Sequence, residues 1–116
     1  MKITNLAENN TILNHFVSEL RDVDIHNDSM RFRNNIERIG QILAYEVSKS
    51  LQYTNADVVT PLGVAKTCHV EDNIVVASIL RAGLPLHNGI LSFFDKAENC
   101  FVSAYRKYIN EKEFDV

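Results

Sequence analysis

Two arginines of this chain, Arg81 and Arg106, follow segments that are typical of strands, and both are candidates for binding an anion. The apolar run Ile74–Leu80 leads directly into Arg81, and a second strand-like run leads to Arg106. A buried guanidinium is costly without a partner, so each arginine either faces water or meets an anion. Because the guanidinium fork binds phosphate oxygens through parallel hydrogen bonds, the pair predicts a phosphate or diphosphate ligand.

The residues after Arg81 favour the same ligand. Ala82 and Gly83 lead into an apolar segment in which Pro85 is typical of a first helical turn. Gly83 permits a close approach of the backbone to a ligand, and a helix N-terminus offers free N–H groups with a partial positive charge. An arginine at a strand end is, however, most often solvated, and the tripeptide Arg-Ala-Gly has little specificity. From spacing alone, both interpretations stay open.

A strand–helix–strand unit must position these residues. We predict a strand over Asn73–Leu80, a helix from about Gly83, and a second strand over Asn99–Tyr108. Such a βαβ unit implies a parallel sheet. The first strand is a continuous β-branched apolar run, which is typical of a strand buried on both faces. Ligands bind beyond the carboxyl ends of parallel strands, so we expect the two guanidiniums to share one crevice.

The chain before this unit predicts helices and a hairpin. A short helix is expected near Asn14–Val23 and a long one over about Met30–Ser50. The long helix should bury a stripe of apolar residues spaced by three and four, namely Phe32, Ile36, Ile39, Leu43, Val47 and Leu51. Two β-favouring runs, Asp57–Thr60 and Val64–Val70, flank the turn signal Thr-Pro-Leu-Gly and predict an antiparallel hairpin. The fold class is therefore α/β, with N-terminal helices and a hairpin.

Composition limits the classes of function. The 116 residues suffice for one modest domain, and 12 basic against 15 acidic residues give a net charge of −3. This charge offers no general attraction to nucleic acid or to an anionic membrane, and no stretch is long and apolar enough for a membrane span. Cys68 and Cys100 are expected to be buried, reduced thiols, and without a secretory signal we expect a cytoplasmic protein. The histidines show no paired spacing, so we expect no metal site formed by them.

Five short motifs in order resemble one enzyme family. They are Arg-Phe-Arg, Tyr-Glu, Thr-Pro-Leu-Gly, Ile-Leu-Arg-Ala-Gly-Leu and Tyr-Arg, and the resemblance as a whole covers about His15 to Tyr108. The set is similar to the N-terminal half of uracil phosphoribosyltransferase, a type I phosphoribosyltransferase. The resemblance implies an incomplete type I fold, in which residues 1–116 form the N-terminal part of a single domain. Residues 55–70 would form a hairpin arm that contacts a partner in a homodimer or a larger homo-oligomer.

The resemblance also implies an activity and a set of site residues. Family members join uracil to the ribose of 5-phosphoribosyl 1-diphosphate (PRPP), releasing diphosphate and UMP in pyrimidine salvage, and Mg²⁺ accompanies the sugar diphosphate. Arg81 and Arg106 would be the catalytic, PRPP-contacting arginines, with Ala82 and Gly83 supplying backbone N–H groups. The Leu80–Arg81 peptide bond would be cis, as in this loop of the family. Arg31 and Arg33 correspond to a region that binds a GTP activator in some relatives, although solvated basic side chains on an amphipathic helix are the preferred explanation.

Two elements of the family pattern are absent from this sequence. The PRPP loop, an acidic strand end followed by a Thr-Gly-Gly turn, lies beyond Tyr108 in the family, as does the segment that binds uracil. We therefore expect a truncated form with negligible transferase activity of its own. The alternatives are a non-catalytic PRPP-binding regulator and a dimerisation module built on the same fold. His87 is expected on a helix surface or in a dimer contact.

Overall fold

The computed structural model describes residues 1–110 and 113–115, so 111–112 and 116 of the predicted domain lie outside the described residues. Two α-helices come first, α1 (Ile12–Arg21) and α2 (Ser29–Ser48), after a short 3-10 helix, η1 (Leu6–Glu8). Both predicted helices are confirmed. Each begins at a side-chain cap: Thr11 accepts a hydrogen bond from the Leu13 amide at 3.3 Å, and Asp28 accepts one from the Arg31 amide at 3.0 Å.

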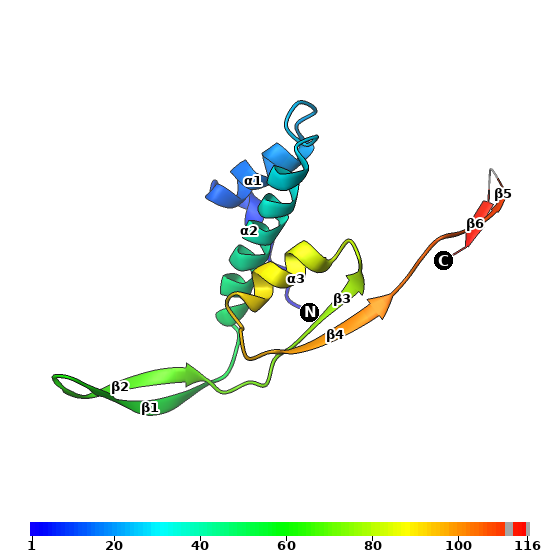
Figure 1. Cartoon of the computed structure of the whole chain (residues 1–116). Coiled ribbons are helices and arrows are strands. Elements are labelled where there is room, and N and C mark those ends of the chain that lie inside the picture. Colours follow the sequence, from blue (N-terminus) through cyan, green and yellow to red (C-terminus); the bar gives the residue numbers. More distant parts are fainter. Residues whose placement is uncertain (111–112, 116) are drawn as a thin grey trace.

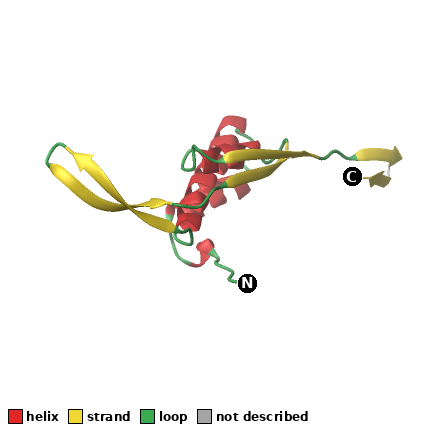
Figure 2. Ribbon diagram, turned by 90° about the horizontal axis from the view of Figure 1, so that it is seen from below, coloured by secondary structure: helices red, strands yellow, loops and turns green. Residues whose placement is uncertain are grey.

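The predicted antiparallel hairpin is confirmed and is longer than expected. It consists of β1 (Tyr53–Thr60) and β2 (Gly63–Val70), paired in register from Tyr53 opposite Val70 to Thr60 opposite Gly63. Gly63 has a φ of +129°, which favours glycine at this turn. The hairpin extends away from the helices in both views (Figures 1 and 2), and no residue of β2 is buried within the described part of the chain.

The parallel sheet is also confirmed. It pairs β3 (Val75–Leu80) with β4 (Glu98–Ser103), in register from Val75 beside Glu98 to Leu80 beside Ser103. The connection between them contains α3 (Leu84–Leu91), which packs on α2 and β3 (Figure 1). The second strand is shorter than predicted: it ends at Ser103, and residues near the end of the chain form a separate hairpin of β5 (Lys107–Asn110) and β6 (Glu113–Asp115).

The prediction that the first parallel strand is buried on both faces is wrong. Val76 is 8% exposed on the face toward α3, whereas Val75 and Ile79, on the other face, are 59% and 62% exposed. The reason is that α3 covers one face, and no described element covers the other. Cys100 pairs in register with Ala77 on that open face, so the expectation that Cys68 and Cys100 are buried is wrong as well: both thiols are free and exposed.

The buried contacts of α2 differ from the predicted apolar stripe. Phe32 and Val47 are 37% and 52% exposed, whereas the other four members of the stripe are half-buried. The buried positions of α2 are instead Asn35, Gly40 and Ala44. Their small or polar side chains allow α1 and α3 to approach the α2 backbone closely, so bulky residues on the flanks stay partly in solvent.

The chain is extended. Its radius of gyration is 18.9 Å and its extents are 68 × 31 × 31 Å, against about 13 Å expected for a compact domain of this length. The buried apolar side chains are accordingly few among the described residues: Leu13, Ala44 and Val76. In the part of the chain that the structure describes, no helix combines the length and apolar character needed to cross a membrane.

Candidate functional site

The two candidate arginines follow strands that end at the same edge of the sheet. Leu80 and Ser103 are register partners at the last position of β3 and β4. Arg81 follows Leu80 directly, and Arg106 lies three residues after Ser103, before β5 begins. The parallel pairing therefore carries both segments past the carboxyl edge of the sheet, where parallel sheets bind ligands (Figure 1).

Arg81 begins the loop between β3 and α3. The peptide bond between Leu80 and Arg81 is cis, as the family resemblance implied. The Arg81 side chain is exposed, and within the described residues its guanidinium has no hydrogen bond or ion pair. A guanidinium without a protein partner can bind an anion from solution with all of its donors. Arg106 is exposed as well.

The loop after Arg81 is held by its own backbone. The Gly83 amide donates to the Ile79 carbonyl oxygen at 3.1 Å, and the Leu84 amide donates to the Arg81 carbonyl oxygen at 3.1 Å. A Cβ at Gly83 would lie 2.9 Å from the Ile79 oxygen and 3.1 Å from the Ser78 Cβ. The glycine is therefore required for close packing on β3. Because the Gly83 amide already donates to the Ile79 carbonyl oxygen, it is not available to a ligand. The Ala82 amide has no protein acceptor among the described residues.

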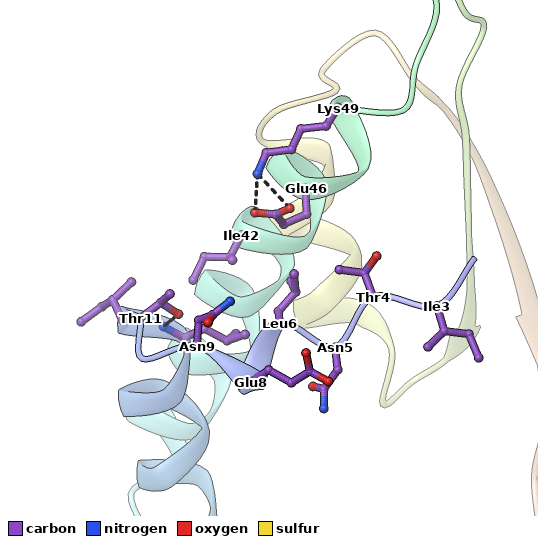
Figure 3. A pocket seen from close by; sticks show the side chains of 12 residues that line it. Ile3, Thr4, Asn5, Leu6, Glu8, Asn9, Thr11, Ile42, Glu46 and Lys49 are labelled. Carbon is purple, nitrogen blue, oxygen red and sulfur yellow. Dashed lines mark hydrogen bonds and ion pairs between the residues drawn. The ribbon is translucent and has the colours of Figure 1, made fainter.

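Several cavities of the described chain lie away from the two arginines. The largest of these, about 630 Å³, lies between the N-terminal segment and α2 and is lined by Leu6, Ile42, Glu46 and Lys49, among others (Figure 3). In this cavity the Lys49 ammonium lies 2.9 Å from the Glu46 carboxylate, whose hydrogen bond raises the pKa of Lys49. Two smaller cavities, about 340 and 260 Å³, adjoin Phe93 and Phe94. Neither Arg81 nor Arg106 lines any of these, so the shared crevice stays a prediction.

The candidate nucleotide-binding arginines lie on the first turns of α2. Arg31 Nη1 lies 3.4 Å from the Glu19 carboxylate of α1, and Asn35 Nδ2 donates to the same carboxylate at 2.6 Å. The Asn35 hydrogen bond, followed by the charge of Arg31, lowers the pKa of Glu19 against the opposing effect of burial. Arg31 is thus partly engaged by α1, whereas Arg33 is exposed. An anion at Arg31 would compete with Glu19.

His87 lies in the interior of the fold. The side chain is 2% exposed, so the expectation of a helix-surface or dimer-contact position is wrong. Its Nε2 lies 2.6 Å from Asn99 Oδ1 on β4, and its ring lies against Phe101, with 4.9 Å between the ring centroids. The signal was present in the spacing, because His87 lies three residues after Leu84 and three and four before Ile90 and Leu91, on a single helix face.

Comparisons with known proteins agree on one family. The family model described as uracil phosphoribosyltransferase matches residues 7–114. A protein of Porphyromonas gingivalis named uracil phosphoribosyltransferase is 51% identical over 116 residues, which are all of this chain and 54% of that protein. One of the same name from Sulfolobus acidocaldarius is 41% identical over 108 residues, covering 90% of this chain and 48% of that protein.

A solved structure has the same fold. The AQ2163 protein from Aquifex aeolicus superposes with a TM-score of 0.69 at 26% sequence identity, covering 90% of this chain and 48% of that one. The chain thus spans about half the length of the relatives that it matches.

Proposed function

The chain belongs to the uracil phosphoribosyltransferase family, and on this basis we propose that it forms the PRPP-binding part of an enzyme that makes UMP from uracil and PRPP in pyrimidine salvage. The observation that carries the proposal is the position of Arg81. Its guanidinium stands at the carboxyl edge of a parallel sheet with no protein partner among the described residues. Cys68 and Cys100 are free thiols, which fits a cytoplasmic enzyme.

The proposed role of the arginines is electrostatic. In the transfer, the bond between C1 of the ribose and the diphosphate breaks and the diphosphate leaves with the bonding electrons. The uracil N1 bonds to C1 and releases its proton to solvent. Negative charge therefore grows on the leaving group. Guanidiniums of Arg81 and Arg106 aimed at that group would bind it more tightly as its charge increases, which lowers the barrier. The exposed Ala82 amide would add one neutral donor.

Magnesium would enter with the substrate. The described residues contain no group of three or more His, Cys, Asp or Glu side chains that could hold a metal ion. The diphosphate oxygens of PRPP are themselves suitable ligands for Mg²⁺. A GTP activator at Arg31 and Arg33 is a separate proposal, which requires the triphosphate to displace the Glu19 carboxylate from its 3.4 Å contact with Arg31.

Two further parts of the proposal concern partners. The hairpin β1–β2 exposes apolar side chains at its tip, with Leu62 101% and Val59 84% exposed, and we assign it as the arm that contacts a second copy. Residues 1–116 span about half of the relatives, so transfer to uracil is proposed for the larger unit that contains both halves of the fold. The family match favours this proposal over a non-catalytic regulator or a pure dimerisation module.

Calorimetric titration of the purified 116-residue chain with PRPP and Mg²⁺ tests the proposal. Removing one charge-assisted contact in Arg81→Ala should weaken binding about tenfold or more. Arg21→Ala, an exposed arginine at the end of α1, is the matched control and should bind PRPP as the unaltered chain does. No PRPP binding, or equal binding by the Arg81 variant, would contradict the proposal.

A further inference from the structure

The hydrogen bond between His87 and Asn99 connects the two segments of the candidate site. His87 lies one turn into α3, and its amide donates to the Gly83 carbonyl oxygen at 3.0 Å. Asn99 lies on β4, which ends at Ser103 and leads to Arg106. The side-chain bond of 2.6 Å thus joins the helix that follows the Arg81 loop to the strand that precedes Arg106.

This side-chain bond spans a gap in the backbone packing. Among the described residues, no α carbon of α3 lies within 8 Å of an α carbon of β4, whereas α3 packs closely on β3 and α2. The imidazole of His87 fills the intervening space, with Nε2 on Asn99 and the ring on Phe101. Apart from the packing of α3 on β3 and the pairing of β3 with β4, this side chain and its bond make the link between α3 and β4.

The hydrogen bond also gives the two ring nitrogens different surroundings. Asn99 Oδ1 can only accept, so Nε2 of His87 is the donor in this bond. Nδ1 is buried without a hydrogen-bond partner among the described residues, and so is the hydroxyl of Ser78, which lies on β3 beneath Gly83. A leucine at position 87 would remove the unpaired Nδ1 but would also take the hydrogen-bond partner away from Asn99 Oδ1. The part-buried polar bond is a specific link between α3 and β4 that apolar packing would not supply.

We propose that His87 is a positioning residue, which holds the Arg81–Gly83 loop and the segment carrying Arg106 at the separation that a diphosphate needs. This inference rests on the proposed function. A group with two phosphates can touch both segments at once, so its affinity depends on their separation. A single phosphate contacts one segment, and its affinity does not depend on the separation.

Two variants that differ in reach test the inference. The amide nitrogen of glutamine can take the place of Nε2, so His87→Gln should keep the bond to Asn99. In His87→Asn the side chain is still polar, but its amide ends near the position of Nδ1 and is too short to reach Asn99 Oδ1. For His87→Asn we expect about a tenfold loss of affinity for magnesium diphosphate, with orthophosphate binding changed less than about twofold. His87→Gln should bind both anions as the unaltered chain does, and Asn99→Leu should repeat the effect of His87→Asn from the other side of the bond.

The readouts separate positioning from folding. Long-range ¹H–¹⁵N NMR of the unaltered chain should show His87 protonated at Nε2, and thermal unfolding should confirm that each variant is folded at the temperature of the titration. Equal losses for both anions, or diphosphate binding unchanged in both His87→Asn and Asn99→Leu, would overturn the positioning role while leaving the proposed function intact. No binding of diphosphate by the unaltered chain would overturn the proposed function and this inference together.

Discussion

Gly40 of α2 and Gly89 of α3 lie directly against each other where the two helices cross. A Cβ built on Gly89 would lie 3.0 Å from the Gly40 α carbon and would overlap the Glu37 carbonyl oxygen, while a Cβ on Gly40 would lie 2.5 Å from the Leu86 carbonyl oxygen. Both glycines are buried. The helices therefore touch backbone to backbone, and this contact orients α3 and the loop that precedes it.

Alanine at Gly89 should destabilise the chain. Alanine favours a helix over glycine by up to about 1 kcal/mol, but a methyl group here must push α3 away from α2, and overpacking costs about 1–3 kcal/mol. We expect a net loss of stability, measured by urea unfolding followed by circular dichroism. Asn88→Ala, at the exposed neighbouring position, is the control and should be neutral or stabilising. A Gly89 variant as stable as the Asn88 variant would show that the helices separate without cost.

The glycine contact shows where sequence reasoning about α2 succeeded and failed. The three- and four-residue spacing correctly predicted the helix, because that spacing reflects the helix period. It did not predict the fully buried positions, which are Asn35, Gly40 and Ala44. How closely two helices approach depends on the partner helix, and α2 alone does not indicate where its neighbours lie. The prediction that β3 is buried on both faces failed for a related reason. Ile79 is apolar and β-branched, as buried strand residues are, but no described element covers it.

Acid should weaken the contact between α1 and α2. The pKa of Glu19 is lowered in the folded chain, first by the hydrogen bond from Asn35 and then by Arg31. A group whose pKa is lower when folded stabilises the fold above its unfolded pKa, and this contribution is lost as pH falls through the folded value. Stability should therefore decline as pH falls below the ordinary value of 4.5.

Urea unfolding at a series of pH values measures this decline. In Glu19→Gln the carboxylate is absent, so the pH dependence in the acidic range should be smaller than in the unaltered chain. Glu8→Gln, which removes an exposed glutamate from η1, is the matched control for the loss of one negative charge. The same acid response in the Glu19 variant and in the unaltered chain would show that this carboxylate is not the group responsible.

The hairpin tip offers a test of the proposed arm. Val59 and Val64 face each other across β1 and β2 and are 84% and 65% exposed. If this tip packs on a second copy, Val59→Lys should bury a charge in the contact and convert dimers to monomers, as measured by sedimentation velocity. Lys66→Ala, further along β2 in the same hairpin, should leave the mass unchanged. A monomeric unaltered chain, or a dimer that the Val59 substitution leaves intact, would contradict the assignment.

The candidate site was partly predictable for a physical reason. Strand patterns and the parallel connection identify which residues follow the sheet edge, so Arg81 and Arg106 could be placed there from sequence. The use of the Gly83 amide by Ile79, and the burial of His87, depend on how the loop folds back on β3 and how far α3 stands from β4. Both features depend on tertiary packing, which the local sequence around each residue does not determine.

The open face of the parallel sheet leads to the last prediction. Ile79 and Val102 are register partners on that face and are 62% and 53% exposed. Parallel sheets are normally covered on both faces. The match covers 54% of the Porphyromonas gingivalis relative, so that protein has nearly as many residues again outside the matched part. We expect the 116-residue chain alone to form negligible UMP from radiolabelled uracil and PRPP, and the remaining segment of that relative, added as a separate polypeptide, to restore turnover.

Substitution on the open face should prevent this restoration. In Ile79→Asp a carboxylate would be buried under the added segment without a partner, so restored activity should fall at least about tenfold, because burying an unpaired charge costs several kcal/mol. Val23→Asp places the same charge at a 73% exposed apolar position between α1 and α2, away from the sheet. The added segment should restore the activity of this variant as fully as that of the unaltered chain. Full restoration with Ile79→Asp would mean that the added segment does not pack on this face, and strong turnover by the 116-residue chain alone would mean that it needs no second segment.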